Sequence, residues 1–118
     1  MGRKYDLEER LIDFALLIDG IIENLPSTKL ANHLSGQIVR SGTSPALNYG
    51  EAQSAESQKD FIHKMQVILK ELRETRIILK IITRKPLLNT HLVEPILIEN
   101  EELIAIFAQS IKTAKSKI

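Results

Sequence analysis

The sequence predicts an all-α fold, an antiparallel up-down-up-down four-helix bundle in which residues 1–118 form a single domain. Apolar residues recur at spacings of three and four through most of the chain, which is the period of a helix buried on one face. Prolines and helix-starting residues divide this pattern into four long segments with short links, and short links favour antiparallel neighbours. Aromatic residues make up only 4% of the chain, so the core must be aliphatic.

The first helix is expected near residues 7–24. Asp6 is its predicted N-cap, and Glu9 follows three residues later, an arrangement that satisfies free backbone amides. Leu25 and Pro26 end the helix, because proline disfavours the helical conformation at the residue before it. The apolar stripe of this helix comprises Leu7, Leu11, Phe14, Ala15, Ile18, Ile21, Ile22 and Leu25.

The second helix is expected over about residues 28–55, with Ser27 as its cap. Gly42 and Pro45 argue for a break, since proline cannot donate to the carbonyl four residues back. A helical period nevertheless continues through them at spacings of four, four, three and four. The residues on this face are Arg40, Ser44, Asn48, Glu51 and Ala55. We therefore expect one helix with a kink or a loosened turn near residues 41–45, and with Asn48 and Glu51 facing other helices.

The third helix is expected to begin after Ser57, with Asp60 as the acidic partner of this cap. It continues to Arg84 or Lys85, and Pro86 stops it. Its candidate core residues are Phe61, Met65, Ile68, Leu72, Leu79 and Ile82.

Further apolar residues of the third helix do not lie on that stripe. Val67, Ile78 and Ile81 fall on roughly the opposite side when about 100° is stepped per residue. A helix with two apolar faces is buried on two sides. We therefore predict that these three residues, or the neighbouring Ile77, lie at a subunit interface of a homo-oligomer.

The fourth helix is expected after residues 87–90, either with Thr90 as its cap or with Pro95 at its effective start. Acidic residues gather early in this segment and basic residues late, which matches the helix dipole at both ends. The charged residues are Glu94, Glu99, Glu101 and Glu102, then Lys112, Lys115 and Lys117.

Composition limits the possible functions. The formal net charge is +1, so no overall field attracts nucleic acid or a membrane, and such binding needs a local patch. The absence of cysteine excludes disulfides, thiolate metal sites and cysteine nucleophiles. The first residues lack the apolar segment of a signal peptide, and no apolar run approaches the about 20 residues of a membrane span. We therefore expect a cytoplasmic protein with no membrane association.

Little in the sequence indicates catalysis. His33, His63 and His91 lie on different helices or caps and are typical of surface or boundary positions. Neither a Gly-x-Ser-x-Gly turn nor a Gly-x-x-x-x-Gly-Lys phosphate loop occurs in the sequence. We expect that the protein is not an enzyme and has no catalytic residue, metal, cofactor or small-molecule substrate.

Polar side chains of the second and third helices admit two interpretations. Asn48, Glu51, Glu71 and Glu74 could form a carboxylate site. Alternatively, the polar residues form an interhelical hydrogen-bond network, because polar groups at a helix interface must be paired. The network is the favoured interpretation, and its expected members are Arg40, Ser44, Asn48, Glu51, Glu71 and Glu74, with Lys70 or Arg73 as further partners.

A basic stripe follows the third helix at spacings of three, three, four and four. It consists of Lys70, Arg73, Arg76, Lys80 and Arg84. The stripe is either a solvated face whose charges pair with Glu71 and Glu74, or a phosphate-binding surface that a symmetric oligomer would repeat. It contains no aromatic residue, so base stacking is not expected and binding to nucleic acid would tolerate many sequences.

Residues 40–82, RSGTSPALNYGEAQSAESQKDFIHKMQVILKELRETRIILKII, resemble the four-helix-bundle family of 23S rRNA intervening-sequence proteins. The flanking helices match in length and pattern, including ENEELIAIFAQSIKT near the end, so the likeness covers the whole chain. The resemblance is carried by Arg40-Ser41-Gly42-Thr43-Ser44, Asn48-Tyr49, Glu51-Ala52, Asp60-Phe61-Ile62, Lys64, Lys70-Glu71 and Glu74-Thr75.

The resemblance implies a cytoplasmic bacterial protein, folded as an antiparallel bundle, assembled as a homopentameric ring and without enzymatic activity. The family is in turn similar to the accessory variability proteins of diversity-generating retroelements, which are basic pentamers that bind nucleic acid. Two functions stay open: a nucleic-acid-associated adaptor for RNA or DNA, and a structural protein–protein interaction module that binds no nucleic acid. A continuous positive band favours the first, and a stripe neutralised by Glu71 and Glu74 favours the second.

Overall fold

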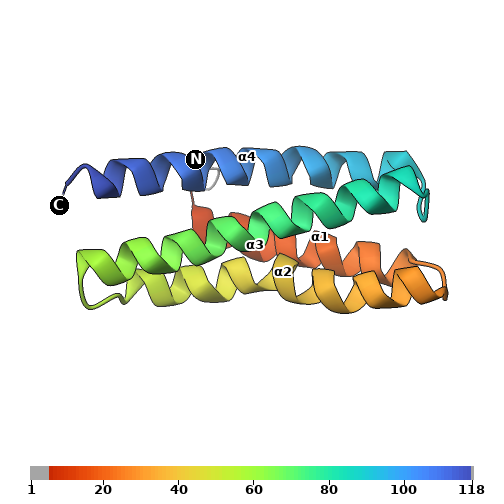
Figure 1. Cartoon of the computed structure of the whole chain (residues 1–118), viewed down its shortest axis with the longest axis horizontal. Coiled ribbons are helices and arrows are strands. Elements are labelled where there is room, and N and C mark those ends of the chain that lie inside the picture. The colour runs from red at the N-terminus through yellow and green to blue at the C-terminus, as the bar shows by residue number, and fades with distance from the viewer. Residues whose placement is uncertain (1–5, 118) are drawn as a thin grey trace.

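In the computed structural model, which describes residues 6–117, the chain forms four helices joined by short links. They are α1 (Leu7–Asn24), α2 (Lys29–Gln53), α3 (Gln58–Arg84) and α4 (Thr90–Lys115). Successive helices run in opposite directions (Figure 1), and the described residues contain no strand. The predicted all-α four-helix bundle is confirmed.

The helices occupy the corners of the bundle in a fixed arrangement. α1 and α3 each pack against α2 and α4, but within residues 6–117 they do not pack against each other, so they lie on one diagonal. α1 has 18 residues, whereas the other helices have 25, 27 and 26. Figure 1 shows that α1 starts well inside the end where α2 meets α3. That end therefore consists of three helices.

Two of the predicted helix starts are confirmed by their hydrogen bonds. The backbone N–H of Glu9 donates to Asp6 Oδ1 at 3.3 Å, and the N–H of Asp60 donates to Ser57 Oγ at 3.0 Å. Both capping residues have extended backbone conformations. Each cap accepts from an amide that has no partner in the first turn.

The other two helix starts differ from the prediction. Thr28, not Ser27, caps α2, since its Oγ1 accepts from the N–H of Ala31 at 3.1 Å. α4 begins at Thr90 with Asn89 as its cap, and the Asn89 side chain accepts from the backbone of the second helical residue at 2.8 Å. Pro95 lies in the second turn of α4, so neither Thr90 as a cap nor a start at Pro95 is correct.

α2 continues as a helix through residues 41–45, with Pro45 buried inside it, and ends at Gln53. The expected interruption at this point is not seen. The packing of α1 explains why position 42 is a glycine: a Cβ added to Gly42 would lie 2.7 Å from Ile18 Cγ1 of α1. The glycine therefore lets α1 approach the backbone of α2 closely, which is a packing role and not a break in the helix.

The core is aliphatic, as the composition predicted, with Phe14 and Phe107 buried in its middle. The candidate core residues of α3 from Met65 to Ile82 are buried, and Phe61 packs partly buried against them. Ile78 is a correction: it is 5% exposed and belongs to the core of its own chain. α3 sits at a corner between two neighbours, so a wider sector of this helix is buried than one stripe.

A buried amide joins α3 to α4. The side chain of Asn100 is fully buried, and its Nδ2 donates to the carbonyl of Leu72 at 3.1 Å. Its Oδ1 has no hydrogen-bond partner among residues 6–117. None of the described helices is both long enough and apolar enough to cross a membrane.

Candidate nucleic-acid interface

The basic stripe lies on the side of α3 that points away from the core. Lys70, Arg73 and Arg84 are exposed, and Lys80 and Arg76 are half-buried. Within the described part of the chain, Arg76 is the one stripe residue in an ion pair, with its Nη1 3.3 Å from Glu101 Oε1 of α4. The other four stripe residues have no described carboxylate within 4.0 Å, the limit for an ion pair.

Glu71 and Glu74 do not neutralise the stripe, because both pair with Arg40 of α2. Arg40 Nη1 lies 2.6 Å from Glu71 Oε1, and its Nη2 donates to Glu74 Oε2. The negative charges, Glu71 first, raise the pKa of Arg40 above its ordinary value. This clasp holds α2 to α3 and leaves the stripe residues on the far side of α3 free of these two carboxylates.

The other expected members of the polar network behave differently. Glu51 faces α3, as predicted, and its Oε1 lies 2.7 Å from Lys64 Nζ. The hydrogen bond to Glu51 raises the pKa of Lys64. Ser44 and Asn48 are half-buried, and no hydrogen bond joins their side chains to another residue of the described range. The structure thus brings together Arg40, Glu71 and Glu74 but does not tie Ser44 and Asn48 to them.

A buried hydroxyl pair beside the clasp was not predicted. Thr75 Oγ1 lies 2.8 Å from Ser41 Oγ, and both side chains are fully buried between α2 and α3. Thr75 also lies 2.9 Å from the carbonyl of Glu71. The sequence places each hydroxyl directly after a residue of the expected network, since Ser41 follows Arg40 and Thr75 follows Glu74. That Ser41 and Thr75 contact each other is evident only from the axial alignment of α2 and α3.

The residues predicted at a subunit interface differ in their exposure to solvent. Ile77 and Ile81 are 53% and 38% exposed, Val67 is half-buried, and Ile78 is in the core. Ile77 and Ile81 line a hollow of about 500 Å³ together with Leu30, Lys80, Arg84 and Lys85. This part of α3 therefore combines exposed aliphatic and basic side chains.

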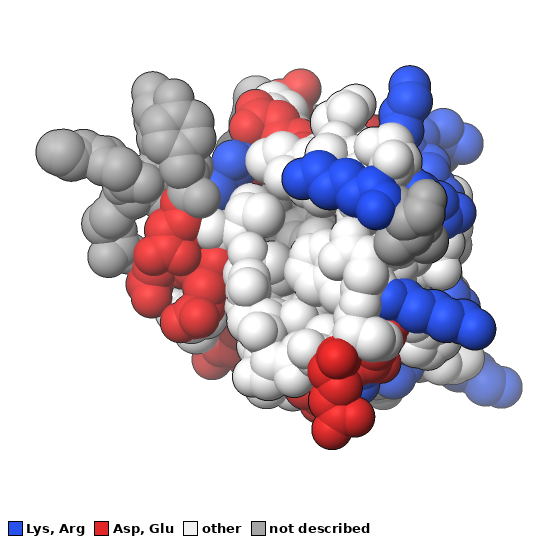
Figure 2. Space-filling model, turned by 90° about the vertical axis from the view of Figure 1, so that its left-hand side faces the viewer, with Lys and Arg blue, Asp and Glu red and all other residues white. Residues whose placement is uncertain are grey.

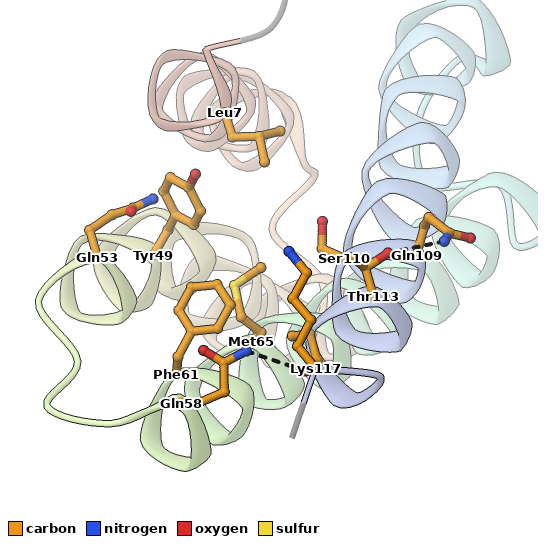
Figure 3. Close-up of a pocket in the computed structure, with 11 residues that line it drawn as sticks. Leu7, Tyr49, Gln53, Gln58, Phe61, Met65, Gln109, Ser110, Thr113 and Lys117 are labelled. Carbon is orange, nitrogen blue, oxygen red and sulfur yellow. Dashed lines mark hydrogen bonds between the residues drawn. The ribbon is translucent and has the colours of Figure 1, made fainter.

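A second hollow of about 500 Å³ opens at the three-helix end of the bundle (Figure 3). Tyr49, Phe61 and Met65 point into it, and glutamine, serine and threonine side chains surround them. The ring of Tyr49 meets that of Phe107 edge-on, with centroids 5.9 Å apart, and burial raises the pKa of Tyr49. Lys117 is the charged residue among those that line the hollow. Among residues 6–117, no carboxylate lines it.

The three histidines are exposed, and the residues described in the structure include no cluster of His, Asp or Glu arranged to hold a metal ion.

No match to the sequence is found among curated proteins. A family model for the 23S rRNA-intervening sequence protein matches residues 3–109. The chain belongs to this family.

The fold of this family member is shared with a solved structure. A protein of unknown function from the S23 ribosomal protein family of Bacteroides thetaiotaomicron VPI-5482 superposes with a TM-score of 0.82 and is 31% identical in sequence. The match covers 89% of the present chain and 97% of that protein.

The motif residues that carried the resemblance to intervening-sequence proteins gather mostly where α2 meets α3. Arg40 and Ser41 contact Glu71, Glu74 and Thr75, and a further motif pair joins Glu51 to Lys64. Gly42 is needed for the approach of α1. In this family member the motif thus builds the bundle, and the candidate binding surface lies on the opposite side of α3.

Proposed function

We propose that the protein is a non-enzymatic, self-associating helical scaffold that binds the phosphate backbone of RNA or DNA through the basic stripe of α3. One observation carries this proposal. Arg40 holds Glu71 and Glu74, so these carboxylates do not pair with the stripe. Lys70, Arg73 and Arg84 stay exposed without a described acidic partner, and exposed cations of this kind release the counterions of a phosphate backbone.

The geometry of the stripe suits a backbone and not the bases. Lys70 and Arg84 are 14 residues apart, which is about 21 Å along a helix. That length faces several successive phosphates of a nucleic acid. Without an aromatic residue in the stripe, no base-stacking platform is available, so binding should tolerate many sequences.

The names of the relatives agree with a nucleic-acid partner. The family is described by intervening sequences of 23S rRNA, and the similar solved protein by a ribosomal protein family. These descriptions support ribosomal RNA as the first nucleic acid to try.

The test is fluorescence anisotropy with a structured RNA and a duplex DNA over a series of salt concentrations. Lys70→Ala/Arg73→Ala should weaken binding to both, and the slope of log K against log salt should become shallower by about two units. Lys112→Ala/Lys115→Ala is the matched control, since it removes the same charge from exposed positions outside the stripe. Equal weakening by both variants, or none by the stripe variant, contradicts the proposal.

A second candidate, a protein–protein module without nucleic-acid binding, is favoured by the exposed Ile77 and Ile81 among the basic residues. This candidate would replace the first if the wild-type protein self-associates but binds neither RNA nor DNA at low salt.

A further inference from the structure

The hollow at the three-helix end is lined by residues of all four helices. Leu7 contributes from the first turn of α1, and Tyr49, Phe61 and Met65 contribute from α2 and α3 (Figure 3). Because α1 begins well inside this end, the described part of the chain leaves the corner of α1 open there (Figure 1). The volume of about 500 Å³ is within the range of about 300–1,000 Å³ that small-ligand sites occupy. The hollow is therefore large enough for a small organic ligand.

Within residues 6–117, the aromatic side chains that solvent can reach both belong to this hollow. Phe14 and Phe107 are fully buried, whereas Tyr49 and Phe61 are half-buried and point into the hollow (Figure 3). The edge-on contact of Tyr49 with Phe107, at 5.9 Å between ring centroids, holds the Tyr49 ring in place. Two rings from different helices thus offer aromatic surface inside one hollow. Aromatic side chains are the surfaces on which unpaired bases stack.

Uncharged hydrogen-bonding side chains surround these rings. The Gln58 amide donates to the carbonyl of Ala114 at 3.3 Å. The Gln109 amide lies 3.3 Å from Thr113 Oγ1. The side chain of Ser110, in contrast, has no hydrogen-bond partner among residues 6–117. Hydroxyl and amide groups both donate and accept, so this rim can bond to the polar edge of any base.

Lys117 is the charged residue of the lining, and its side chain reaches toward the middle of the hollow (Figure 3). It forms no ion pair with a residue of the range 6–117. Burial first, and the carboxylates of Asp6 and Glu8 after it, raise the pKa of Tyr49, so these two acids stand near its ring on the α1 side. Figure 2 looks onto this end and shows acidic side chains along one border and basic side chains along another. An anionic group is therefore expected at Lys117 and not beside α1.

We infer that this hollow binds one unpaired nucleotide of an RNA strand. The base stacks on the rings of Tyr49 and Phe61, Ser110 bonds to its edge, and Lys117 binds its phosphate. A purely apolar ligand would leave the polar rim unpaired, and Lys117 would repel a cation. Because every base has a flat aromatic face, the site selects an unpaired nucleotide and not a sequence.

This inference rests on the proposed function, and it adds to the stripe a site for the single-stranded end of the same RNA. Lys70 follows Phe61 by nine residues, about 14 Å along α3. About four nucleotides span that distance at the 3.4 Å spacing of phosphates along one strand. The exposed residues that continue the outward side of α3 from Lys70 toward the hollow are Gln66, His63 and Lys59. None of them is acidic, so a strand that leaves the stripe meets no carboxylate on this side of α3.

The test compares two RNA hairpins with the same stem and the same four-nucleotide 3′ overhang. The overhang ends in 2-aminopurine in one hairpin and in an abasic nucleotide in the other, so both contain equal numbers of phosphates. Fluorescence anisotropy measures both affinities, and the emission of 2-aminopurine falls when this base stacks on an aromatic ring. The wild type should quench the base and bind its hairpin at least about fivefold more tightly than the abasic one. The same pair with 5′ overhangs covers the opposite strand polarity.

Two variants locate the effect. Phe61→Leu keeps an aliphatic side chain but removes the ring, so the preference for the base should disappear, and circular dichroism checks the fold. Lys117→Glu changes an exposed residue and should weaken binding of both hairpins more than Lys112→Glu does. Lys112 is the matched control, because it is exposed on the same helix and does not line the hollow.

The outcomes separate this inference from the stripe proposal. Equal affinities of the wild type for the two hairpins, an unchanged preference in Phe61→Leu, or equal losses in the two lysine variants overturns the inference. If binding still depends on Lys70 and Arg73, the stripe proposal stands. A preference for the base that survives Lys70→Ala/Arg73→Ala without weaker binding overturns the stripe proposal alone. Binding to neither hairpin at low salt overturns both.

Discussion

The two polar sides of α3 differ in charge and in whether their side chains have partners. On the side that faces α2, Glu71 and Glu74 are clasped by Arg40 and Thr75 is bonded to Ser41. On the outward side, Lys70, Arg73 and Arg84 are exposed and lack a described carboxylate partner. The position of α2 accounts for the difference in pairing, because it supplies a partner to one side and leaves the other free to bind something else.

The largest expected effect concerns the close approach of α1 on the α2 side. Gly42→Ala should lower the free energy of unfolding by about 1–3 kcal/mol, because the new Cβ would overlap the stiff, branched Ile18. Gly36→Ala, on the same helix with nothing within 4 Å of its added Cβ, should raise it by about 0.5–1 kcal/mol. Urea unfolding measures both. Changes of the same sign in the two variants would show that the contact is not tight.

The next effect concerns the buried hydroxyl pair. Thr75→Val leaves the Ser41 hydroxyl without its partner and should cost about 1–2 kcal/mol of unfolding free energy. Adding Ser41→Ala should restore part of that loss, because no buried hydroxyl then remains unpaired. Thr83→Val is the matched control, since Thr83 lies on the same helix but its hydroxyl bonds only its own turn. Additive losses in the double variant would argue against the pair.

A smaller effect is expected for two arginines, Arg40 at the α2–α3 interface and Arg73 on the outward side of α3. Arg40→Ala should cost about 0.5–1 kcal/mol, the range for a partly exposed ion pair, because it leaves Glu71 and Glu74 close together. Arg73→Ala should change the free energy of unfolding by less than about 0.5 kcal/mol. The cost of Arg40→Ala should shrink in high salt, as measured by thermal unfolding. If Arg73→Ala proves the more costly, the outward side is not free.

The smallest expected effect is a shift in the pKa of Tyr49 at the three-helix end. Burial raises the pKa of Tyr49 above its ordinary value of about 10. The native state therefore holds this proton more tightly than the unfolded state does. The protonated Tyr49 thus contributes to the free energy of unfolding at pH values below about 10, and this contribution is lost as the pH rises through the native pKa. In Tyr5→Phe, Tyr49 is the sole tyrosine, and its tyrosinate absorbance should appear at higher pH than in the urea-unfolded chain. Coincident titrations would contradict the burial.

Local features of the fold could be predicted, and long-range alignments could not. Asp6 and Ser57 were identified as caps because a cap needs only a suitable oxygen three residues before an amide. Ser27 and Thr28 both meet that requirement, and the conformation of the link decides between them. Ile78 was misplaced because stepping 100° per residue gives a direction but not the width of the sector that two neighbouring helices bury.

The candidate site shows the same limit. The stripe follows from spacing within one helix, so its five members could be named from the sequence. The clasp of Glu71 and Glu74 by Arg40 was also expected, as part of the interhelical network, but the ion pair of Arg76 with Glu101 was not, since it depends on the axial positions of α3 and α4. The bond between Ser41 and Thr75 depends likewise on the axial positions of α2 and α3.

The buried amide of Asn100 has a mechanical consequence for the bundle. Aliphatic side chains can exchange partners when one helix slides on another by any small distance, but such a slide separates Asn100 from the Leu72 carbonyl. A slide of half a turn, about 2.7 Å, would leave the amide dehydrated and unbonded. Under tension along its axis, α4 should therefore hold its place on α3 until this bond breaks and then yield abruptly.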